Sequence, residues 1–351
     1  MKPRMSSMER VLKTLSYQEP DQVPLVLPAH LHGAKELGLS LPEYFSKPAY
    51  VAEGQLRIQQ KYQTDAVFGF FYAAIEIQAF GGEVLFHEDG PPNSGEPLIH
   101  KYEDIKKLVP PDIATNSYLR KVLEVLGILK KQVQQQIPVI GIVVSPTSLP
   151  IMQLGFEQYL RMVYETPDLL TSLLQINEQF CIAWANAQIQ AGASVIVYFD
   201  PLSSPTILPK DIYLKLGFPI AKHVLQQVKG TMAIHLASGR TMGILEEIIQ
   251  TGAIAVGVSC QENMREIKAL VQKRLAILGN LNGIEMRTWT PQYAQRMVRD
   301  ALAAAAPGGG YIMSDNHGEI PFQVSDDVLF AISVAAHTWG QYPLEWVMNG
   351  I

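Results

Sequence analysis

The sequence contains little cysteine and little charge. Only Cys181 and Cys260 occur among 351 residues, far apart and in no CxxC pair, which excludes a disulfide framework and a cysteine-rich zinc module. Charged residues make up 17% of the chain, below the average of about 25% for globular domains. The mean hydropathy of +0.08 argues against long disordered tails. One compact domain spanning residues 1–351 in the reducing cytoplasm is therefore predicted.

Basic clusters and long apolar runs are also missing. The net charge is −5, and without a basic cluster there is no electrostatic footprint for nucleic acid. No run approaches the roughly 18 apolar residues of a membrane span. Residues 1–24 are typical of a short amphipathic helix and a turn rather than of a signal peptide. A soluble protein is expected.

Eight short apolar runs rich in β-branched residues alternate with longer helical patterns. These runs are 22–30, 65–72, 137–146, 193–201, 230–238, 253–260, 274–283 and 310–318. Eight parallel strands joined by helices close a (β/α)8 TIM barrel, which is the predicted α/β fold. Residues 83–102 contain a Gly/Pro/Asn-rich turn and predict a hairpin inserted after the second run. A doubly wound open sheet is the alternative, but no GxGxxG follows the first run.

Polar residues follow the carboxyl ends of these runs, where TIM barrels carry their catalytic groups. They are His30, His32, Tyr72, Ser145, Tyr198, Asp200, His235, Ser238, Cys260, Glu262, Asn280, Asn282, Asp315, Asn316 and His317. Polar residues also gather wherever a strand meets solvent, where they cap loops or bind backbone groups. Position alone is therefore weak support for function.

Two of these sequence segments give stronger support for a functional role. His235 lies in Met-Ala-Ile-His-Leu-Ala-Ser, where a structural strand would carry valine or leucine, so a metal-binding or acid–base role is favoured. In Ser-Asp-Asn-His-Gly at 314–318, three side chains able to bind metal or transfer protons precede a glycine that permits a tight turn. These segments predict an active site around His235 and His317.

The order of several segments resembles the uroporphyrinogen decarboxylase superfamily over nearly the whole chain. The segments are TDAVFGFF, AFGGEVLF, GFEQYLRMVYETPDLL, QAGASVIVYFDP, IHLASG, LAILGNLNG and PGGGYIMSDNHGEIP. True decarboxylases of that family carry an arginine-rich segment near the first strand, which holds the substrate carboxylates. The matching segment here, Leu-Pro-Ala-His-Leu-His-Gly, has no arginine, and Tyr72 stands where the family has its key aspartate. Decarboxylation of a haem precursor is therefore not expected.

Another branch of the superfamily contains methyltransferases that act with a separate corrinoid protein, and some of them bind zinc through a His-x-Cys motif and a distant cysteine. The resemblance places His235 at the first ligand, Ala237 at the lost cysteine, and His317 at or beside the third ligand. Sulfur-rich zinc ligation, which activates thiols, is thereby put in doubt. An oxygen- and nitrogen-rich zinc site would instead polarise the oxygen of a methyl donor. Without metal, a histidine could act as general acid.

The resemblance therefore implies a methyltransferase that moves a methyl group from a small O-methyl donor, of the methoxyarene or methanol class, to the cobalamin of a partner corrinoid protein. His235 and His317 would hold zinc or protonate the leaving oxygen, assisted by Glu262 or Asp315. Cys260 is a further expected zinc ligand. The residues expected to line the donor pocket are His30, Tyr72, Tyr198, Asp200 and Asn280. The alternatives are a uroporphyrinogen decarboxylase, a methylcobamide:thiol methyltransferase and a catalytically silent barrel that binds a corrinoid protein.

Overall fold

The structure, a computed structural model, describes residues 5–348. Its main sheet has seven parallel strands in the order β1-β4-β5-β6-β7-β8-β9. They are β1 (Val67–Phe68), β4 (Val139–Val144), β5 (Val195–Phe199), β6 (Met232–His235), β7 (Ala255–Gly257), β8 (Ala276–Leu281) and β9 (Tyr311–Asp315). Each lies inside one of the predicted runs. The predicted α/β barrel architecture is confirmed.

The prediction of a regular strand at 22–30 is wrong, but this segment does occupy the position of a barrel strand. Leu25 forms a parallel bridge with Met313 of β9, and on its other side the Leu25 carbonyl accepts the Asp65 N–H at 2.7 Å. The segment therefore lies between β9 and the chain leading into β1, and it closes the barrel. Its two prolines have no N–H to donate, so a continuous ladder cannot form.

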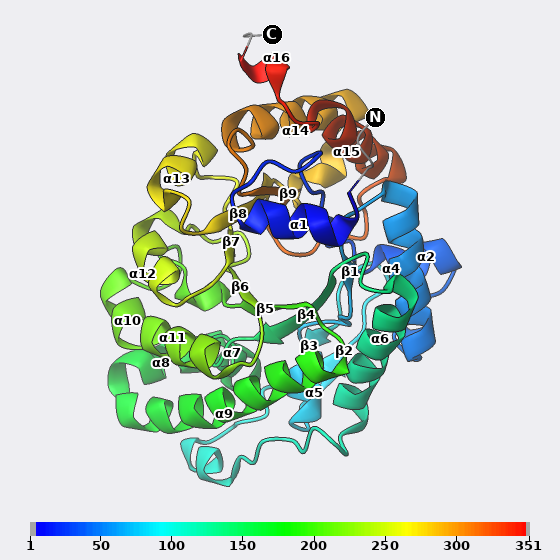
Figure 1. Cartoon of the computed structure of the whole chain (residues 1–351). Coiled ribbons are helices and arrows are strands. Elements are labelled where there is room, and N and C mark those ends of the chain that lie inside the picture. The colour runs from blue at the N-terminus through cyan, green and yellow to red at the C-terminus, as the bar shows by residue number, and fades with distance from the viewer. Residues whose placement is uncertain (1–4, 349–351) are drawn as a thin grey trace.

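Helices surround the strands as an outer ring (Figure 1). The α-helices are α1 (Ser7–Leu15), α2 (His32–Leu37), α3 (Leu41–Tyr44), α4 (Pro48–Tyr62), α5 (Ile75–Ala79), α6 (Ser117–Val133), α7 (Leu149–Leu154), α8 (Phe156–Glu165), α9 (Pro167–Ala191), α10 (Lys210–Lys215), α11 (Gly217–Gln227), α12 (Leu245–Gln250), α13 (Met264–Val271), α14 (Pro291–Ala305), α15 (Asp326–Trp339) and α16 (Glu345–Met348). Short 3-10 helices are η1 (Tyr102–Lys107), η2 (Pro201–Ser203), η3 (Met242–Ile244) and η4 (Glu285–Thr288). Within residues 5–348, no helix is both long and apolar enough to cross a membrane.

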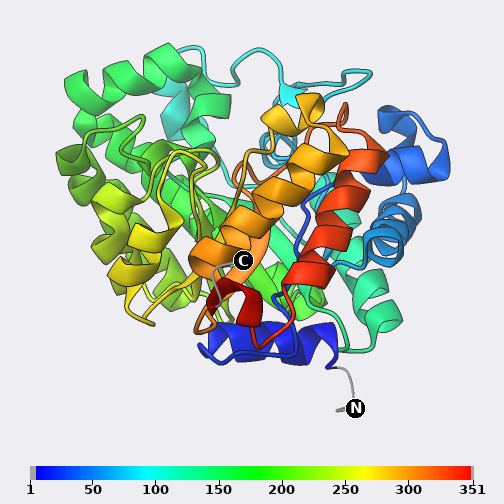
Figure 2. The same cartoon turned by 90° about the horizontal axis from the view of Figure 1, so that it is seen from above.

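The two ends of the barrel are covered differently. At one end lies α1, which begins with a capping box between Ser6 and Glu9. At the opposite end lies the hairpin of β2 (Val84–Leu85) and β3 (Asn93–Ser94), which pair antiparallel. Figure 2 shows blue α1 below the barrel and the cyan hairpin region above it. The hairpin predicted within 83–102 is therefore confirmed, and it lies at the carboxyl end of the strands.

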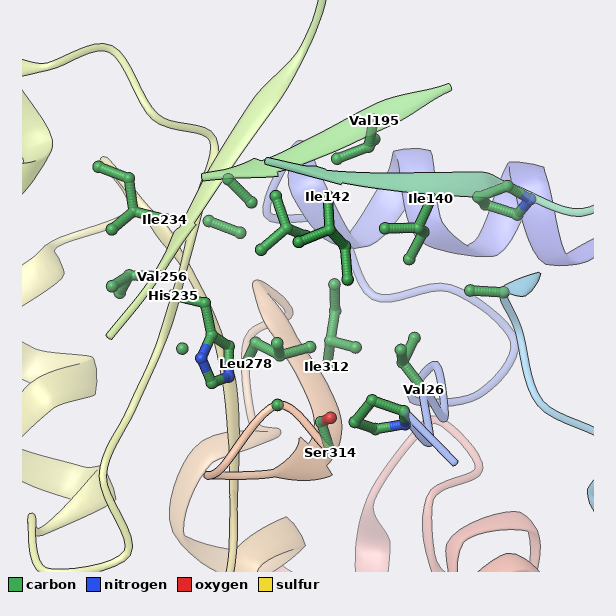
Figure 3. Close-up of a pocket in the computed structure, with 18 of the residues that line it drawn as sticks. Val26, Ile140, Ile142, Val195, Ile234, His235, Val256, Leu278, Ile312 and Ser314 are labelled. Atoms are coloured by element: carbon green, nitrogen blue, oxygen red, sulfur yellow. The ribbon is translucent and has the colours of Figure 1, made fainter. Parts of the chain in front are cut away.

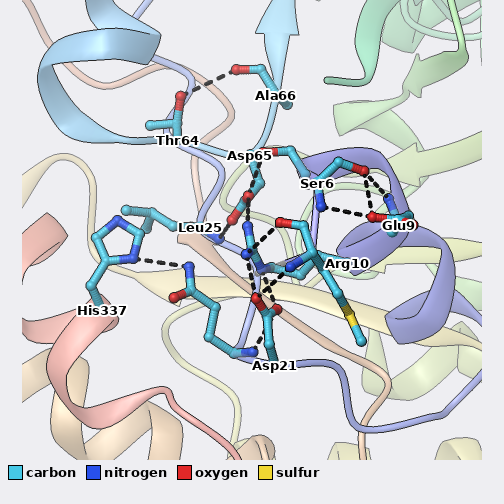
Figure 4. A network of polar contacts seen from close by, with 12 residues as sticks. Ser6, Glu9, Arg10, Asp21, Leu25, Thr64, Asp65, Ala66 and His337 are labelled. Carbon is cyan, nitrogen blue, oxygen red and sulfur yellow. Dashed lines mark hydrogen bonds and ion pairs between the residues drawn. The ribbon is translucent and has the colours of Figure 1, made fainter. Parts of the chain in front are cut away.

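A buried ion-pair network fastens α1 to the amino end of the barrel (Figure 4). The Arg10 guanidinium donates to both carboxylate oxygens of Asp21 at 2.8 Å and to Asp65 Oδ1 at 2.5 Å. The other Asp65 oxygen accepts the Leu25 N–H at 2.9 Å. One arginine therefore joins the helix, the turn after it and the segment that closes the barrel.

Candidate active site at the carboxyl end of the barrel

A cavity of about 100 Å³ lies inside the barrel. Val11 and Leu15 of α1 line it at the amino end, and His235, Ser314 and Gly318 line it at the carboxyl end. Nearly all the other lining residues are aliphatic or aromatic, and Figure 3 shows Ile140 and Ile142 of β4 and Ile312 of β9 pointing into the interior. The cavity is therefore an apolar space with polar groups at the end where barrel enzymes carry their chemistry.

His235 ends β6 and its ring is held on three sides. It stacks on Phe199 with ring centroids 6.0 Å apart. A Cβ added to Gly257 would lie 2.3 Å from Cδ2 and 2.7 Å from Nε2 of the ring, so the ring occupies space that only glycine leaves free. Its Nδ1 accepts the Ala237 N–H at 3.0 Å, made possible by a left-handed backbone at Ala237 with φ of 50°.

These contacts define the chemical state of His235. Because Nδ1 accepts a backbone hydrogen bond, the hydrogen-bond network assigns the ring proton to Nε2. Burial, and then the nearby His317, lower the pKa of His235 to about 4. The Nε2 atom is buried and finds no hydrogen-bond partner within the described chain. His235 therefore presents a neutral N–H donor at neutral pH.

Asp315 is the last residue of β9, and His317 lies in the turn that follows. The Asp315 carboxylate accepts the backbone N–H groups of His317 at 2.8 Å and of Gly318 at 3.1 Å. Burial raises the pKa of Asp315 to about 7. His317 Nδ1 shares a hydrogen bond of 3.0 Å with Ser238 Oγ, and burial lowers the pKa of His317. The turn therefore brings together the two predicted histidines and a carboxyl group that is partly protonated at neutral pH.

Glu319 is a residue that the sequence analysis missed, although it follows Gly318 directly. Burial, and then Asp315, raise the pKa of Glu319 to about 8. Its Oε1 is buried and has no hydrogen-bond partner among residues 5–348. A carboxyl group of this kind carries a proton at neutral pH and has a free oxygen to present it. The clue in the sequence was its place, two residues after a predicted site histidine.

Two predicted acidic residues have structural partners instead. Glu262 accepts the N–H groups of Thr241 at 2.7 Å and Met242 at 2.6 Å, and the Thr241 hydroxyl at 2.9 Å. Asp200 Oδ1 accepts the hydroxyls of Ser145, Thr147 and Ser148 at 2.6 to 2.8 Å. Glu262 shapes the loop after β6, and Asp200 ties the end of β5 to the loop after β4. Both act as positioning residues in this arrangement.

The residues predicted to line a donor pocket are divided between several environments. Tyr198 is a correction: Val195, Val197 and Phe199 of β5 line the cavity, so strand alternation turns Tyr198 toward the helices. The Asn280 amide donates to the carbonyls of Ser259 at 2.9 Å and Glu262 at 3.2 Å, and therefore braces the loop after β7.

Tyr72 and His30 are buried in aromatic surroundings. The Tyr72 hydroxyl donates to Gln78 Oε1 at 2.8 Å. His30 meets Phe68 and Phe70 edge-on, with ring centroids 4.6 and 4.9 Å away. Burial lowers the pKa of His30 to about 3, so the ring is neutral. Neither residue brings a charge to the site.

The predicted zinc ligands do not form a fitting set. Among residues 5–348, no three His, Cys, Asp or Glu side chains are grouped so that they could hold a metal ion. His235 Nδ1 is already used by a backbone N–H, and burial raises the pKa of the Cys260 thiol, which disfavours the thiolate that metals bind.

A second buried carboxyl group, Glu76 of α5, lies beside the carboxyl end of β4 and gives a pH-dependent prediction. Its Oε1 accepts the Val144 N–H at 2.9 Å, and burial raises the pKa of Glu76 to about 8 from 4.5. Between pH 4.5 and about pH 8 the Glu76 carboxyl group keeps its proton only in the folded state. Its contribution to the free energy of unfolding therefore falls as pH rises. Glu76→Gln keeps an acceptor oxygen and cannot ionise. Relative to wild type, its unfolding free energy should rise on the order of 3 kcal/mol between pH 5 and pH 8.

Urea unfolding at several pH values measures this difference. The exposed Glu103→Gln is the matched control, and its difference from wild type should stay constant with pH. A pH-independent difference for Glu76→Gln would show that the carboxyl group is ionised in the folded state.

The sequence and the fold match known proteins over nearly the whole chain. The family model described as Uroporphyrinogen decarboxylase (URO-D) matches residues 6–339, and the chain belongs to this family. Relatives named uroporphyrinogen decarboxylase include one from Cupriavidus necator, 28% identical over 90% of this chain and 92% of the relative. Another, from Ralstonia pickettii, is 28% identical over 87% of both chains.

Solved structures show the same architecture. A methyltransferase from Methanosarcina mazei superposes with a TM-score of 0.85, covering 95% of this chain and 99% of its own at 20% identity. A B12-independent methionine synthase from Shewanella sp. W3-18-1 has a TM-score of 0.56, covering 88% of this chain and 91% of its own at 14% identity. At these identities the likeness shows the fold alone.

Proposed function

We propose that this protein is a methyltransferase that moves a methyl group from a small O-methyl donor to the cobalt of a corrinoid held by a separate protein. The observation that carries this proposal is the unpaired Nε2–H of His235, which stands at the carboxyl end of an apolar cavity. A buried N–H donor without a partner stabilises an oxygen that gains negative charge. Breaking the C–O bond of a methyl donor creates such an oxygen.

The site also contains a group that can supply the proton. In the transfer, the methyl carbon bonds to reduced cobalt, the C–O bond breaks, and its electron pair stays on oxygen. Glu319, whose buried carboxyl group has a pKa of about 8 and an oxygen without a partner among residues 5–348, then protonates that oxygen while His235 Nε2 donates a hydrogen bond to it. His317 is held by Ser238, and Asp315 fixes the turn that leads to Glu319 by accepting the N–H groups of His317 and Gly318.

Exposed apolar side chains around the opening of the barrel support the proposal that a partner protein binds there. Five large apolar side chains are exposed in segments that follow strand carboxyl ends, each at 36 to 45%: Leu85, Phe86, Ile207, Met242 and Ile284. Loops that follow parallel strands lie at the same end of a barrel. These side chains offer a partner protein apolar surface to cover at that end, although other large apolar side chains, such as Phe330 and Val334 of α15, are exposed on the outer helices. A corrinoid protein bound there would bring its cobalt to the opening of the cavity.

Uroporphyrinogen decarboxylation is the second candidate, favoured by the names of the relatives at 28% identity. Its substrate carries several carboxylates, for which guanidinium groups are the natural partners. No arginine or lysine is among the described residues that line the cavity. Burial keeps both His30 and His32 neutral, because it lowers their pKa values to about 3 and about 4. This chemistry favours an uncharged substrate.

A single set of incubations tests both candidates. The purified protein is mixed with reduced corrinoid protein and, in turn, methoxyarenes, methanol and methylamines, and the absorbance of methylcobalamin is followed. In parallel, uroporphyrinogen is supplied and coproporphyrinogen is measured. We expect methylcobalamin from an oxygen-linked donor and no coproporphyrinogen. Absence of methylcobalamin with every donor overturns the proposal, and coproporphyrinogen formation establishes the rival.

A further inference from the structure

The interior of the barrel is less filled than barrels of this kind usually are. TIM barrels normally pack bulky branched side chains in layers across their axis. Here three of the lining residues are alanines: Ala66, Ala233 and Ala255. Since protein interiors contain few voids larger than a water molecule, a cavity of about 100 Å³ at this place requires an explanation.

Two polar atoms at the carboxyl end of the cavity have no partner. His235 Nε2 and Ser314 Oγ are both buried, and neither forms a hydrogen bond with any described part of the chain. Both residues line the cavity, and Figure 3 shows them at the same end of it. Buried polar groups are nearly always hydrogen-bonded, and an exception indicates a missing ligand or water. The two atoms together suit a ligand with one oxygen and an apolar body.

Charge and size narrow the class of ligand. No Asp, Glu, Lys or Arg is among the described residues that line the cavity, and moving an ion into apolar surroundings costs many kcal/mol, which excludes methylammonium ions and carboxylates. The volume of about 100 Å³ is roughly two-thirds of an engineered cavity of about 150 Å³ that binds benzene. Methoxybenzene is larger than benzene and therefore needs more room than this cavity offers, whereas a short aliphatic chain fits.

We propose that the barrel cavity is a binding site for a short, uncharged aliphatic alcohol or ether, whose oxygen accepts a hydrogen bond from His235 Nε2 or Ser314 Oγ. This inference rests on the proposed function for the identity of the ligand as the methyl donor. The cavity site implies that the part of the donor that remains after the methyl group has been transferred is a short chain. Methoxyarenes are then poor donors because their ring cannot enter.

Binding to the protein alone, without corrinoid protein, tests the site directly. Xenon-129 NMR reports whether the cavity admits a small apolar atom, and ligand-observed NMR measures methanol, 1-propanol and methoxybenzene. For so few atoms we expect dissociation constants on the order of millimolar for the two alcohols, and none measurable for methoxybenzene. Absence of xenon and of both alcohols from the wild-type protein overturns the proposal.

Variants that fill or enlarge the cavity sharpen the test. Ala255→Leu occupies the space, and the affinity for 1-propanol should fall at least about tenfold. Ala303→Leu, on α14 and outside the cavity lining, is the matched control and should bind normally. Ile140→Ala enlarges the cavity and should admit methoxybenzene. Should Ala255→Leu fail to fold, Ala233→Val replaces it. Normal 1-propanol affinity in a folded filled variant contradicts the proposal.

Failure of this inference and failure of the proposed function are distinguishable. If the alcohols bind but no donor yields methylcobalamin, the cavity site stands and the methyl transfer does not. If methoxyarenes yield methylcobalamin at equal rates in wild type and Ala255→Leu, methyl transfer stands and the cavity has no part in selecting the donor.

Discussion

Replacement of His235 by alanine is expected to lower kcat/KM for methyl transfer by a factor of about 10²–10⁴. The ring presents an otherwise unpaired Nε2–H at the end of the cavity, so its removal takes away a donor to the leaving oxygen. His235→Gln places an amide N–H donor near the position of Nε2 and should recover part of the loss. The rate of methylcobalamin formation measures the effect, and the urea midpoint checks that each variant is folded.

Two further variants separate the role of the ring from general damage. His223→Ala removes an exposed histidine that pairs with Glu178 on the outer helices, and the rate should not change. Gly257→Ala leaves His235 in the chain but places a methyl group within 2.3 Å of its ring, so the rate should fall as well. Wild-type rates in His235→Ala would assign the transfer to other groups.

The pH dependence of the rate has a defined sign. Asp315 and Glu319, with pKa values of about 7 and 8, are protonated below those values and lose their protons above them. A proton supplied by Glu319 therefore makes the rate fall as pH rises past about 8. His235, with a pKa of about 4, stays neutral throughout this range.

Loss of Arg10 is expected to destabilise the fold by about 3–5 kcal/mol. The guanidinium is 5% exposed and the Asp65 carboxylate 1%. Arg10→Met keeps much of the apolar bulk of the side chain but leaves Asp65 buried without its cation, which is the costly part of breaking a buried ion pair. Urea unfolding measures the loss.

Two comparisons identify the cause of that loss. Arg57→Met breaks a pair with Glu53 in which both side chains are about half exposed, and such surface pairs contribute only about 0.3–0.5 kcal/mol. Arg10→Met combined with Asp65→Asn removes the unpaired charge and should recover part of the stability. If the double variant is no more stable than Arg10→Met, lost packing rather than an unpaired charge explains the effect.

The covering of the barrel's amino end depends on the same residue. Val11 and Leu15 of α1 line the cavity there, and Arg10 joins that helix to the segment that closes the barrel. The stability of α1 and the closure of the cavity are therefore linked through one side chain.

The sequence by itself determined the architecture and which end of it carries polar groups. Seven strands and the hairpin lie where the apolar runs and the turn-forming residues predicted them. Because the strands are parallel, residues at their carboxyl ends meet at one end of the barrel, which is why His235 and His317 could be associated without a structure. In the first run, 22–30, the prolines prevent a continuous strand, and the segment pairs with β9 through a single bridge between Leu25 and Met313.

Only the tertiary structure decided what each polar residue does. Strand alternation took Tyr198 out of the cavity, and local hydrogen bonds gave Asp200 and Glu262 structural partners. The state of His235 depends on an N–H from Ala237, and the protons of Asp315 and Glu319 depend on burial. The physical reason is that apolar periodicity is a local property of the chain. Protonation, hydrogen-bond partners and empty space depend on side chains that folding brings together from distant segments.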